Sequence, residues 1–307
     1  RVLALFFELL VQLWYFALIG ALISTLVWRY LPRAWLRRAL ERRAASSIAI
    51  ASLLGLLSPL CTFAAIPIVG RLIALRMPAA PLIAFMMASP LMNPALFFYT
   101  AGIINLEMAI ARTITALCTG LLAGAAVRFA QERGYLRFDA LALEHIPSEL
   151  SHAMWAPGEE PNRAATLRRF RADLFFIGRF FTLGIAIAAL VQAFISEDLV
   201  RRMVGDDSAW AVPAALALGI PLYACGGGTL PVVETMMRMG MTTGAALAFF
   251  VSGPATKFST LSMLGAVFGK RLLGLYLVIM LGSALLWGYA YPFSNRYLET
   301  KIEWSVP

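Results

Sequence analysis

Two cysteines, Cys61 and Cys225, lie in chain segments whose prolines and glycines break helices. Cys61 belongs to the run Ser58–Pro67, and Cys225 to the run Pro221–Pro231, which also holds three successive glycines. Thiolates suit soft metal ions and thiophilic metalloids, so two thiols facing one cavity would bind a soft solute such as trivalent arsenic. The alternative is that both are small buried hydrophobes, the commonest fate of a free cysteine. Cys118 is expected to be structural.

The backbone of these two runs is a second candidate for ligand binding. Proline lacks an amide donor and glycine tolerates conformations that other residues resist, so both leave free amides and carbonyls in an apolar segment. A helix that begins near Pro67 or Pro231 would also favour an anion or a thiolate. The alternative is a pair of proline kinks that fill a tight helix contact. The predicted substrate-binding residues in these runs are Cys61, Thr62, Pro67, Cys225, Gly226, Gly227, Gly228, Thr229 and Pro231.

Two further runs, Ser89–Pro94 and Ser252–Lys257, also interrupt apolar segments. A polar or charged residue deep in a membrane is costly and should point into the protein. Asn93 and Lys257 are therefore expected to line a solute path, although the Lys257 side chain could instead extend to the cytoplasmic surface. Lys257 and Glu234 are candidates for charge compensation or proton coupling, and the alternative for Glu234 is a place near a hairpin end.

The elements that carry these residues are predicted to be membrane helices. Of the 307 residues, 60% are hydrophobic and 14% are charged, whereas soluble domains are about 45–50% apolar and about 25% charged. A crossing needs about 20 consecutive apolar residues. Segments of that length are Leu3–Val27, Ala79–Ile104, Met108–Val127, Leu174–Ile195 and Leu272–Tyr291. The composition predicts an all-α polytopic membrane protein, with the lipid bilayer as its surroundings.

The chain repeats itself at an offset of 164 residues without a gap. When the sequence is shifted by 164 residues, Cys61 aligns with Cys225, Pro67 with Pro231, and Pro90 with Pro254. A chance alignment of apolar segments rarely pairs both cysteines and prolines, so the sequence predicts a duplication. The expected parts are a first membrane repeat (1–127), a charged cytoplasmic linker (128–172), a second membrane repeat (173–293) and a C-terminal tail (294–307).

Charges reverse between corresponding loops of the two repeats. The loop Arg29–Arg43 is strongly basic, and its counterpart Ser196–Asp207 is acidic on balance. Glu107 precedes the last helix of the first repeat, whereas Lys270 and Arg271 precede the last helix of the second. Because basic loops collect in the cytoplasm, the two repeats are predicted to be inverted. Each is expected to hold about three spanning helices and one broken or re-entrant segment, as in many secondary transporters.

Several function classes lack their sequence signals. The chain has no glycine-lysine phosphate loop, and its two histidines, His145 and His152, lie in the predicted linker. The net charge of +9 comes from loop residues and not from a basic and aromatic stripe, so nucleic acid is not an expected partner. No enzyme activity and no cofactor are predicted, and the only metal site considered is the soft pair Cys61 and Cys225.

Four runs in order resemble the bacterial predicted-permease family that includes the organoarsenical efflux permeases. They are SPLCTFAAIPIV, AFMMASPLMNP, IPLYACGGGTLPVVE and ALAFFVSGPATKF. The resemblance implies efflux of trivalent organic arsenicals, or of a related soft species, in exchange for protons. Many members carry Cys-Ser-Cys-Gly where this chain has Cys61-Thr62-Phe63-Ala64, so only the first thiol of that motif remains.

The resulting hypothesis is a multi-pass secondary permease of the bacterial inner membrane that exports a small soft solute. One alternative is a transporter or channel for another small solute or an anion, in which the cysteines only pack and Lys257 dominates. A more remote alternative is a membrane-embedded enzyme, for which Cys61 and Ser58 lack a nearby partner in the sequence. The oligomeric state does not follow from the sequence.

Overall fold

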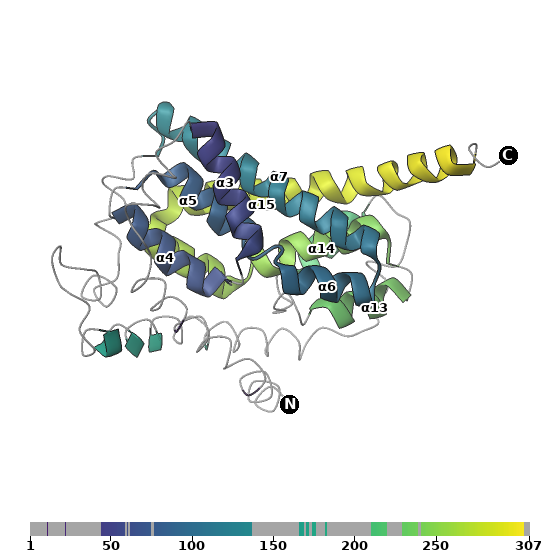
Figure 1. The fold of residues 1–307 in the computed structure, drawn as a ribbon, viewed down its shortest axis with the longest axis horizontal. Helices are drawn as coiled ribbons and strands as arrows, with labels where there is room; N and C mark the ends of the chain where they lie inside the picture. The colour runs from purple at the N-terminus through teal and green to yellow at the C-terminus, as the bar shows by residue number, and fades with distance from the viewer. Residues whose placement is uncertain are drawn as a thin grey trace.

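The computed structural model describes residues 11, 22, 44–58, 60, 62–74, 77–136, 166–168, 170–171, 174–175, 182, 210–219, 229–238 and 241–303. Within these ranges the chain is all-helical, with no strand (Figure 1). The predicted crossings Leu3–Val27 and Leu174–Ile195 lie almost wholly outside them. The main helices are α3 (Ala44–Leu57), α4 (Thr62–Ala74), α5 (Ala79–Ala88), α6 (Pro94–Ile103), α7 (Leu106–Glu132), α12 (Ala211–Gly219), α13 (Thr229–Arg238), α14 (Thr243–Ala255) and α15 (Phe258–Glu303).

The helix ends follow the prolines and the capping residues of the sequence. Helix α3 ends directly before Ser58-Pro59, and α5 ends directly before Ser89-Pro90, as predicted for the two interrupted segments. The side chains of Asn93 and Asn105 accept hydrogen bonds from backbone amides of the first turns of α6 and α7. In α15, Gly269 adopts a left-handed φ of 77° and divides the helix into two stretches, 258–268 and 270–303.

Small residues bring α3, α5 and α7 into close contact. A methyl group added to Gly124 of α7 would come within 2.5 Å of Ile48 Cγ2 in α3 and 3.0 Å of Ala84 Cβ in α5. One turn earlier in α7, Gly120 lies against Ser52 and Ala88 in the same way. Glycines at this spacing let membrane helices approach closely. From Gly120 to Gly124 the contacts move back from Ser52 to Ile48 in α3 and from Ala88 to Ala84 in α5. Helices α3 and α5 therefore run in the same direction, and α7 runs against both.

Because α3 and α5 run in the same direction, the chain must run back between them, and α4 is the helix that does so. The chain leaves the end of α3, passes the break at residues 58–61, and uses α4 to reach the start of α5. A helix of 14 residues such as α3 is about 21 Å long, which is shorter than the roughly 30 Å hydrocarbon core of a bilayer. The chain therefore reverses direction between the two short helices α3 and α4, and Leu60 between them is buried.

Two helices of the second half begin at positions displaced by 164 residues from their counterparts in the first. Helix α14 starts at Thr243 as α5 starts at Ala79, and α15 starts at Phe258 as α6 starts at Pro94. The packing also recurs. Gly288 lies against Val212 and Ala248, which occupy the positions equivalent to Ile48 and Ala84 around Gly124. Two separate halves of the chain thus build the same three-helix contact.

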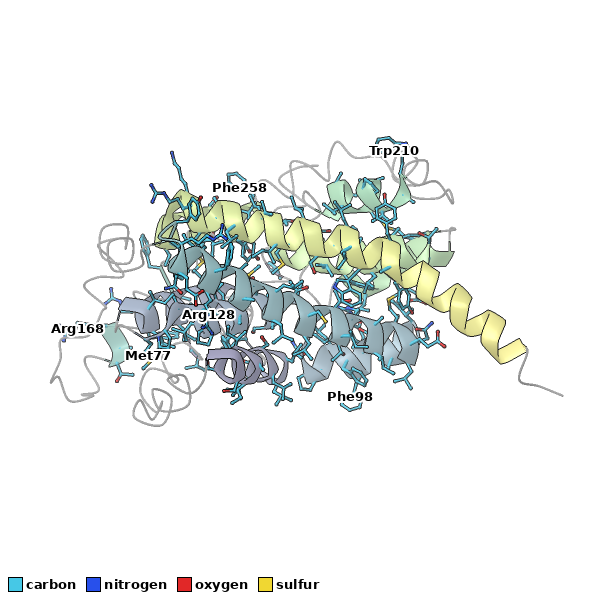
Figure 2. All side chains as sticks on the ribbon, turned by 90° about the horizontal axis from the view of Figure 1, so that it is seen from above. Met77, Phe98, Arg128, Arg168, Trp210 and Phe258 are labelled. Atoms are coloured by element: carbon cyan, nitrogen blue, oxygen red, sulfur yellow. The ribbon has the colours of Figure 1, made fainter. Side chains whose placement is uncertain are left out.

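The two longest helices run in opposite directions through the molecule. Helix α7 runs toward one end, and the 270–303 stretch of α15 runs toward the other (Figure 1). Figure 2 shows Arg128, near the end of α7, and Phe98, in α6, toward opposite ends, with the final turns of α15 leaving on the Phe98 side. Met108, near the start of α7, accordingly shares an apolar cluster with Trp287 and Tyr291 late in α15.

Among the described residues, two helices are long and apolar enough to cross a membrane, Leu106–Glu132 and Thr260–Tyr291. Length and composition alone place them in this class. Helices α5 and α6 are each only 10 residues long and follow one another on the same side of α7. Joined across the turn at residues 89–93, they form one discontinuous segment that runs alongside the continuous helix α7.

Candidate functional site

The two breaks of the first half meet inside the protein. The Ser89 hydroxyl donates a 2.7 Å hydrogen bond to the carbonyl oxygen of Leu60, which directly precedes Cys61. Ser89 is fully buried, and Thr62, the first residue of α4, is 5% exposed. The tip of the α3–α4 hairpin therefore lies against the turn between α5 and α6, and both breaks open the helical backbone at the same place.

Several predicted site residues cannot be located in this arrangement. Cys61, Cys225, Gly226, Gly227 and Gly228 lie outside the described residues, so the approach of the two thiols stays a prediction. The other residues predicted from the broken runs fall in helices: Pro67 in α4, and Thr229 and Pro231 in α13, of which Thr229 is the first residue.

Asn93 and Lys257 occupy equivalent positions at the starts of equivalent helices. The Asn93 side chain accepts a 2.9 Å hydrogen bond from the amide of Leu96, and the Lys257 carbonyl accepts one of 2.9 Å from Leu261. Asn93 is half-buried, whereas the Lys257 side chain is 4% exposed. Lys257 is thus buried inside the protein, and its place on the solute path stays a prediction.

Glu234, the other candidate for coupling, is half-buried on α13. Helix α13 packs against α14 and α6, as its equivalent α4 packs against α5 and the start of α15. Helices α4 and α13 therefore each contact a helix of the other half. Glu234 thus lies on a helix at the boundary between the halves.

Arg112, near the start of α7, is a functional candidate that the sequence analysis did not select. Its side chain is 3% exposed. Nη1 donates a 2.5 Å hydrogen bond to the Thr100 hydroxyl in α6, and Nη2 lies 3.5 Å from the carbonyl oxygen of Leu91. The guanidinium carbon lies 4.0 Å from the centre of the Phe250 ring in α14. Arg112 therefore joins the first half to the second.

The hydrogen-bonding capacity of Arg112 is only partly used. Its Nε is buried and has no hydrogen-bond partner among the described residues, although a guanidinium carries five N–H donors. Within the described part of the chain Arg112 makes no ion pair. A buried cation is costly unless it is paired and hydrogen-bonded, so this side chain is a candidate for binding a negatively charged group.

A second polar contact links the halves further along α7. The Thr119 hydroxyl donates to the Thr115 carbonyl one turn earlier and is in hydrogen-bond contact with the Ser283 hydroxyl of α15. Thr119 and Ser283 are themselves equivalent in the repeat, since they are 164 positions apart. The contact joins α7 of the first half to α15 of the second, so it lies on the boundary between the halves.

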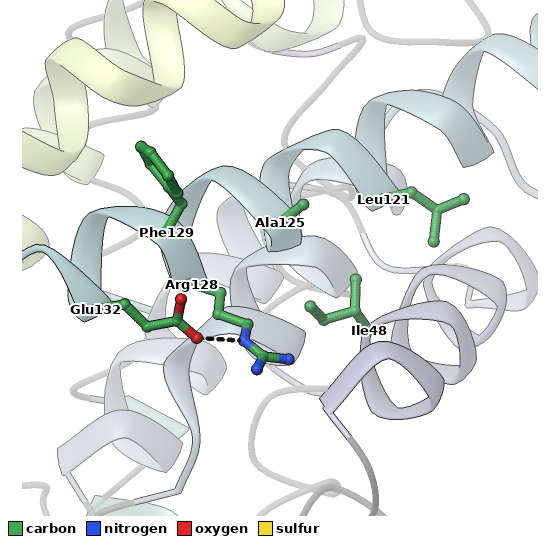
Figure 3. Close-up of a pocket in the computed structure, with 6 residues that line it drawn as sticks. All are labelled: Ile48, Leu121, Ala125, Arg128, Phe129 and Glu132. Atoms are coloured by element: carbon green, nitrogen blue, oxygen red, sulfur yellow. Dashed lines mark hydrogen bonds and ion pairs between the residues drawn. The ribbon is translucent and has the colours of Figure 1, made fainter.

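A surface groove of about 420 Å³ lies near the other end of α7, where Ile48, Leu121, Ala125, Arg128, Phe129 and Glu132 line it (Figure 3). Arg128 Nε donates a 2.7 Å hydrogen bond to Glu132 Oε1 within the same helix. The groove contains none of the predicted site residues. Arg128 is also 16 residues, or about 24 Å along the helix, from Arg112. We therefore place the candidate site at the breaks and at Arg112.

A family model described as predicted permease matches residues 1–293. The chain belongs to the predicted-permease family. It is 24% identical over 290 residues to the UPF0718 protein YcgR of Bacillus subtilis, covering 92% of this chain and 95% of that protein. It is 25% identical over 262 residues to the UPF0718 protein YraQ of Escherichia coli, covering 85% and 72%. No solved structure matches the chain.

Family membership makes this permease a membrane protein that transports a solute, and confirms the resemblance seen in the four sequence runs. The discontinuous segments and the polar contacts between the halves are therefore features of a transporter. Arg112 could have been found from the sequence as the one charged residue inside the predicted crossing Met108–Val127. It lies only five positions from Glu107, however, near the end of that segment, where a charged residue is common.

Proposed function

We propose that this permease is a secondary transporter in which a small solute passes between two inverted halves. The observation that carries the proposal is the contact between the equivalent residues Thr119 and Ser283. A transporter built from two like halves can open to either side by tilting one half against the other at their boundary. The breaks that meet at Ser89 and Leu60 supply free backbone groups within the protein.

The inverted orientation of the halves is supported by two independent features. Helix α7 and the 270–303 stretch of α15 are equivalent in the repeat and run in opposite directions (Figure 1). Charges reverse in the same sense, with acidic Glu107 at the start of α7 and basic Lys270 and Arg271 at the start of the equivalent stretch. If both helices cross the bilayer, the axis that relates the halves lies in the membrane plane.

The proposed substrate is a trivalent organoarsenical or a related soft metal(loid) species, exported from the bacterial cytoplasm across the inner membrane by proton antiport. Support comes from the sequence, where the equivalent thiols Cys61 and Cys225 fall in the broken runs. Thr62, Pro67, the glycines 226–228, Thr229 and Pro231 would contribute backbone and hydroxyl contacts. Asn93 and Lys257 would line the path, and Lys257 or Glu234 would carry the coupling charge.

Uptake of a trivalent organoarsenical into everted membrane vesicles tests this function. We expect uptake that depends on the proton gradient and that falls with Cys61→Ser, with Cys225→Ser and with both together. Cys118→Ser is the matched control, because Cys118 lies in α7 without a cysteine equivalent. Full uptake by the double variant would keep the permease but remove the thiols from its mechanism. A folded intact chain without uptake would refute the arsenical substrate.

A second candidate function is the transport of a small anion, and one observation favours it. Arg112 places a buried positive charge between the halves, with unused donors. Under this hypothesis the cysteines only pack, and substitution of both would change transport little. Substitution of Arg112 or Lys257 would instead abolish it.

A further inference from the structure

We propose that the guanidinium of Arg112 is a binding site for one small monovalent anion with two coplanar oxygens, a carboxylate or an oxyanion. This inference rests on the proposed transport function, because the side chain is 3% exposed and an anion can reach it only when the halves separate. The site consists of Arg112 with Thr100, the Leu91 carbonyl and Phe250.

The unused donors of Arg112 lie on one edge of the guanidinium. Nη1 is engaged by the Thr100 hydroxyl, which in turn donates to the Leu96 carbonyl. Nε has no partner, and Nη2 has only the 3.5 Å contact to Leu91, which is at the limit of a hydrogen bond. Nε and Nη2 point their hydrogens the same way, and this pair of donors matches the two oxygens of a carboxylate or oxyanion.

Helix packing does not by itself require an arginine at this position. The equivalent of Arg112 in the second half is Tyr276, and the equivalents of Thr100 and Phe250 are Leu264 and Met86. Tyr276, Leu264 and Met86 all lie buried in one apolar cluster. The second half thus packs this position with the uncharged residue Tyr276, whereas the first half packs it with the cation Arg112. Because a buried cation is the costlier choice, the charge in the first half needs a reason other than packing.

The position of Arg112 suits an anion that is transported or that drives transport. Its hydrogen-bond partners belong to the first half and the stacked ring of Phe250 belongs to the second. Any motion of one half against the other therefore changes the surroundings of the guanidinium. The apolar neighbours Phe250 and Leu91 leave a single positive charge to balance, which favours a monovalent anion over a divalent one.

Anion binding to the intact purified chain in detergent tests the site. The melting temperature is measured at constant pH and ionic strength while chloride is replaced by acetate, benzoate or nitrate, and a Kd is taken from each titration. We expect at least one of these anions to stabilise the chain more than chloride does. Acetate and benzoate together would indicate a carboxylate ligand, and nitrate an inorganic oxyanion.

Arg112→Gln removes the charge, and Arg112→Lys keeps the charge but loses the paired donors. Each is expected to raise the Kd by about tenfold or more, the loss typical of a charged hydrogen bond. Arg128→Gln is the matched control, because Arg128 is an exposed arginine of the same helix. An unchanged Kd in Arg112→Gln, or equal stabilisation by chloride, would overturn the proposal.

If Arg112→Gln does not fold, a variant copied from the second half keeps the test open. Arg112→Tyr with Thr100→Leu and Phe250→Met reproduces the residue set of Tyr276, Leu264 and Met86. Anion binding that survives in this triple variant would also overturn the proposal. An intact chain that binds anions through Arg112 but takes up no arsenical would refute the arsenical substrate and leave this site standing.

Discussion

Thr119 and Ser283 are equivalent residues of the two halves, and their hydroxyl groups touch. Thr119 also donates to the Thr115 carbonyl, so Ser283 is the donor in the shared contact. Both side chains are buried, with exposed fractions of 0% and 4%. The contact therefore places a pair of hydroxyls on the boundary between the halves, further along α7 than the charged contact of Arg112 with Phe250.

The two partners of this contact should differ in the cost of their removal. Thr119→Val leaves the Ser283 donor buried without its partner, whereas Ser283→Ala leaves Thr119 bonded to Thr115. We expect Thr119→Val to lower the free energy of unfolding by about 1–3 kcal/mol and Ser283→Ala by about 0.5–1 kcal/mol. Unfolding in detergent measures both. Equal costs, or a larger cost for Ser283→Ala, would mean that the hydroxyls are not arranged in this way.

Gly288 should be far less tolerant of alanine than a neighbouring glycine of the same helix. An added methyl group at Gly288 would lie 2.6 Å from Val212 Cγ1 and 3.1 Å from Ala248 Cβ, whereas nothing lies within 4 Å at Gly282. We expect Gly288→Ala to cost about 1–3 kcal/mol of unfolding free energy. Gly282→Ala should be neutral or stabilise by about 0.5–1 kcal/mol.

Rescue distinguishes overpacking from other effects at Gly288. Val212→Ala removes the closest group, so the double variant should recover part of the stability that Gly288→Ala loses. Gly124 is the equivalent glycine and meets the equivalent residue Ile48, so Gly124→Ala with Ile48→Ala should behave alike. If neither pair shows recovery in thermal unfolding, the packing inferred for these two positions is incorrect.

The bond between Ser89 and Leu60 should matter for transport as well as for stability. Ser89→Ala removes the link between the hairpin tip and the α5–α6 turn, and leaves the Leu60 carbonyl without this donor. We expect a loss of about 1–3 kcal/mol in unfolding free energy and a lower rate of solute uptake in vesicles. Thr113→Val is the control, because that hydroxyl bonds only to the Ala109 carbonyl of its own helix. Unimpaired uptake by a folded Ser89→Ala protein would show that the link is not needed.

The sequence predicted the breaks after α3 and α5 because they depend on local residue types. Pro59 and Pro90 each follow the last residue of a helix by two positions, although Pro67 and Pro231 lie inside α4 and α13. The role of Arg112 was missed because its significance depends on partners from three other segments: Leu91, Thr100 and Phe250. No local pattern reveals such a meeting.

The reversal of the chain between α3 and α4 could be predicted only in part from the sequence. Charge counting required one segment not to cross, but the direction of α3 relative to α5 appears only in the contacts of Gly120 and Gly124. For Cys61 and Cys225 the sequence alone gives the alignment of the two residues. That their thiols face one cavity stays a prediction.

The proposed transport mechanism requires the inverted orientation of the two halves, which one accessibility measurement tests directly. Glu107 and Arg271 are equivalent, exposed residues in the first turns of α7 and of the second stretch of α15. Glu107→Cys and Arg271→Cys would each be labelled with a membrane-impermeant maleimide in right-side-out and in everted vesicles, with the unsubstituted chain as background. We expect Glu107→Cys to react only from outside and Arg271→Cys only from the cytoplasmic side. Labelling of both from the same side would contradict the inverted arrangement and the transport mechanism built on it.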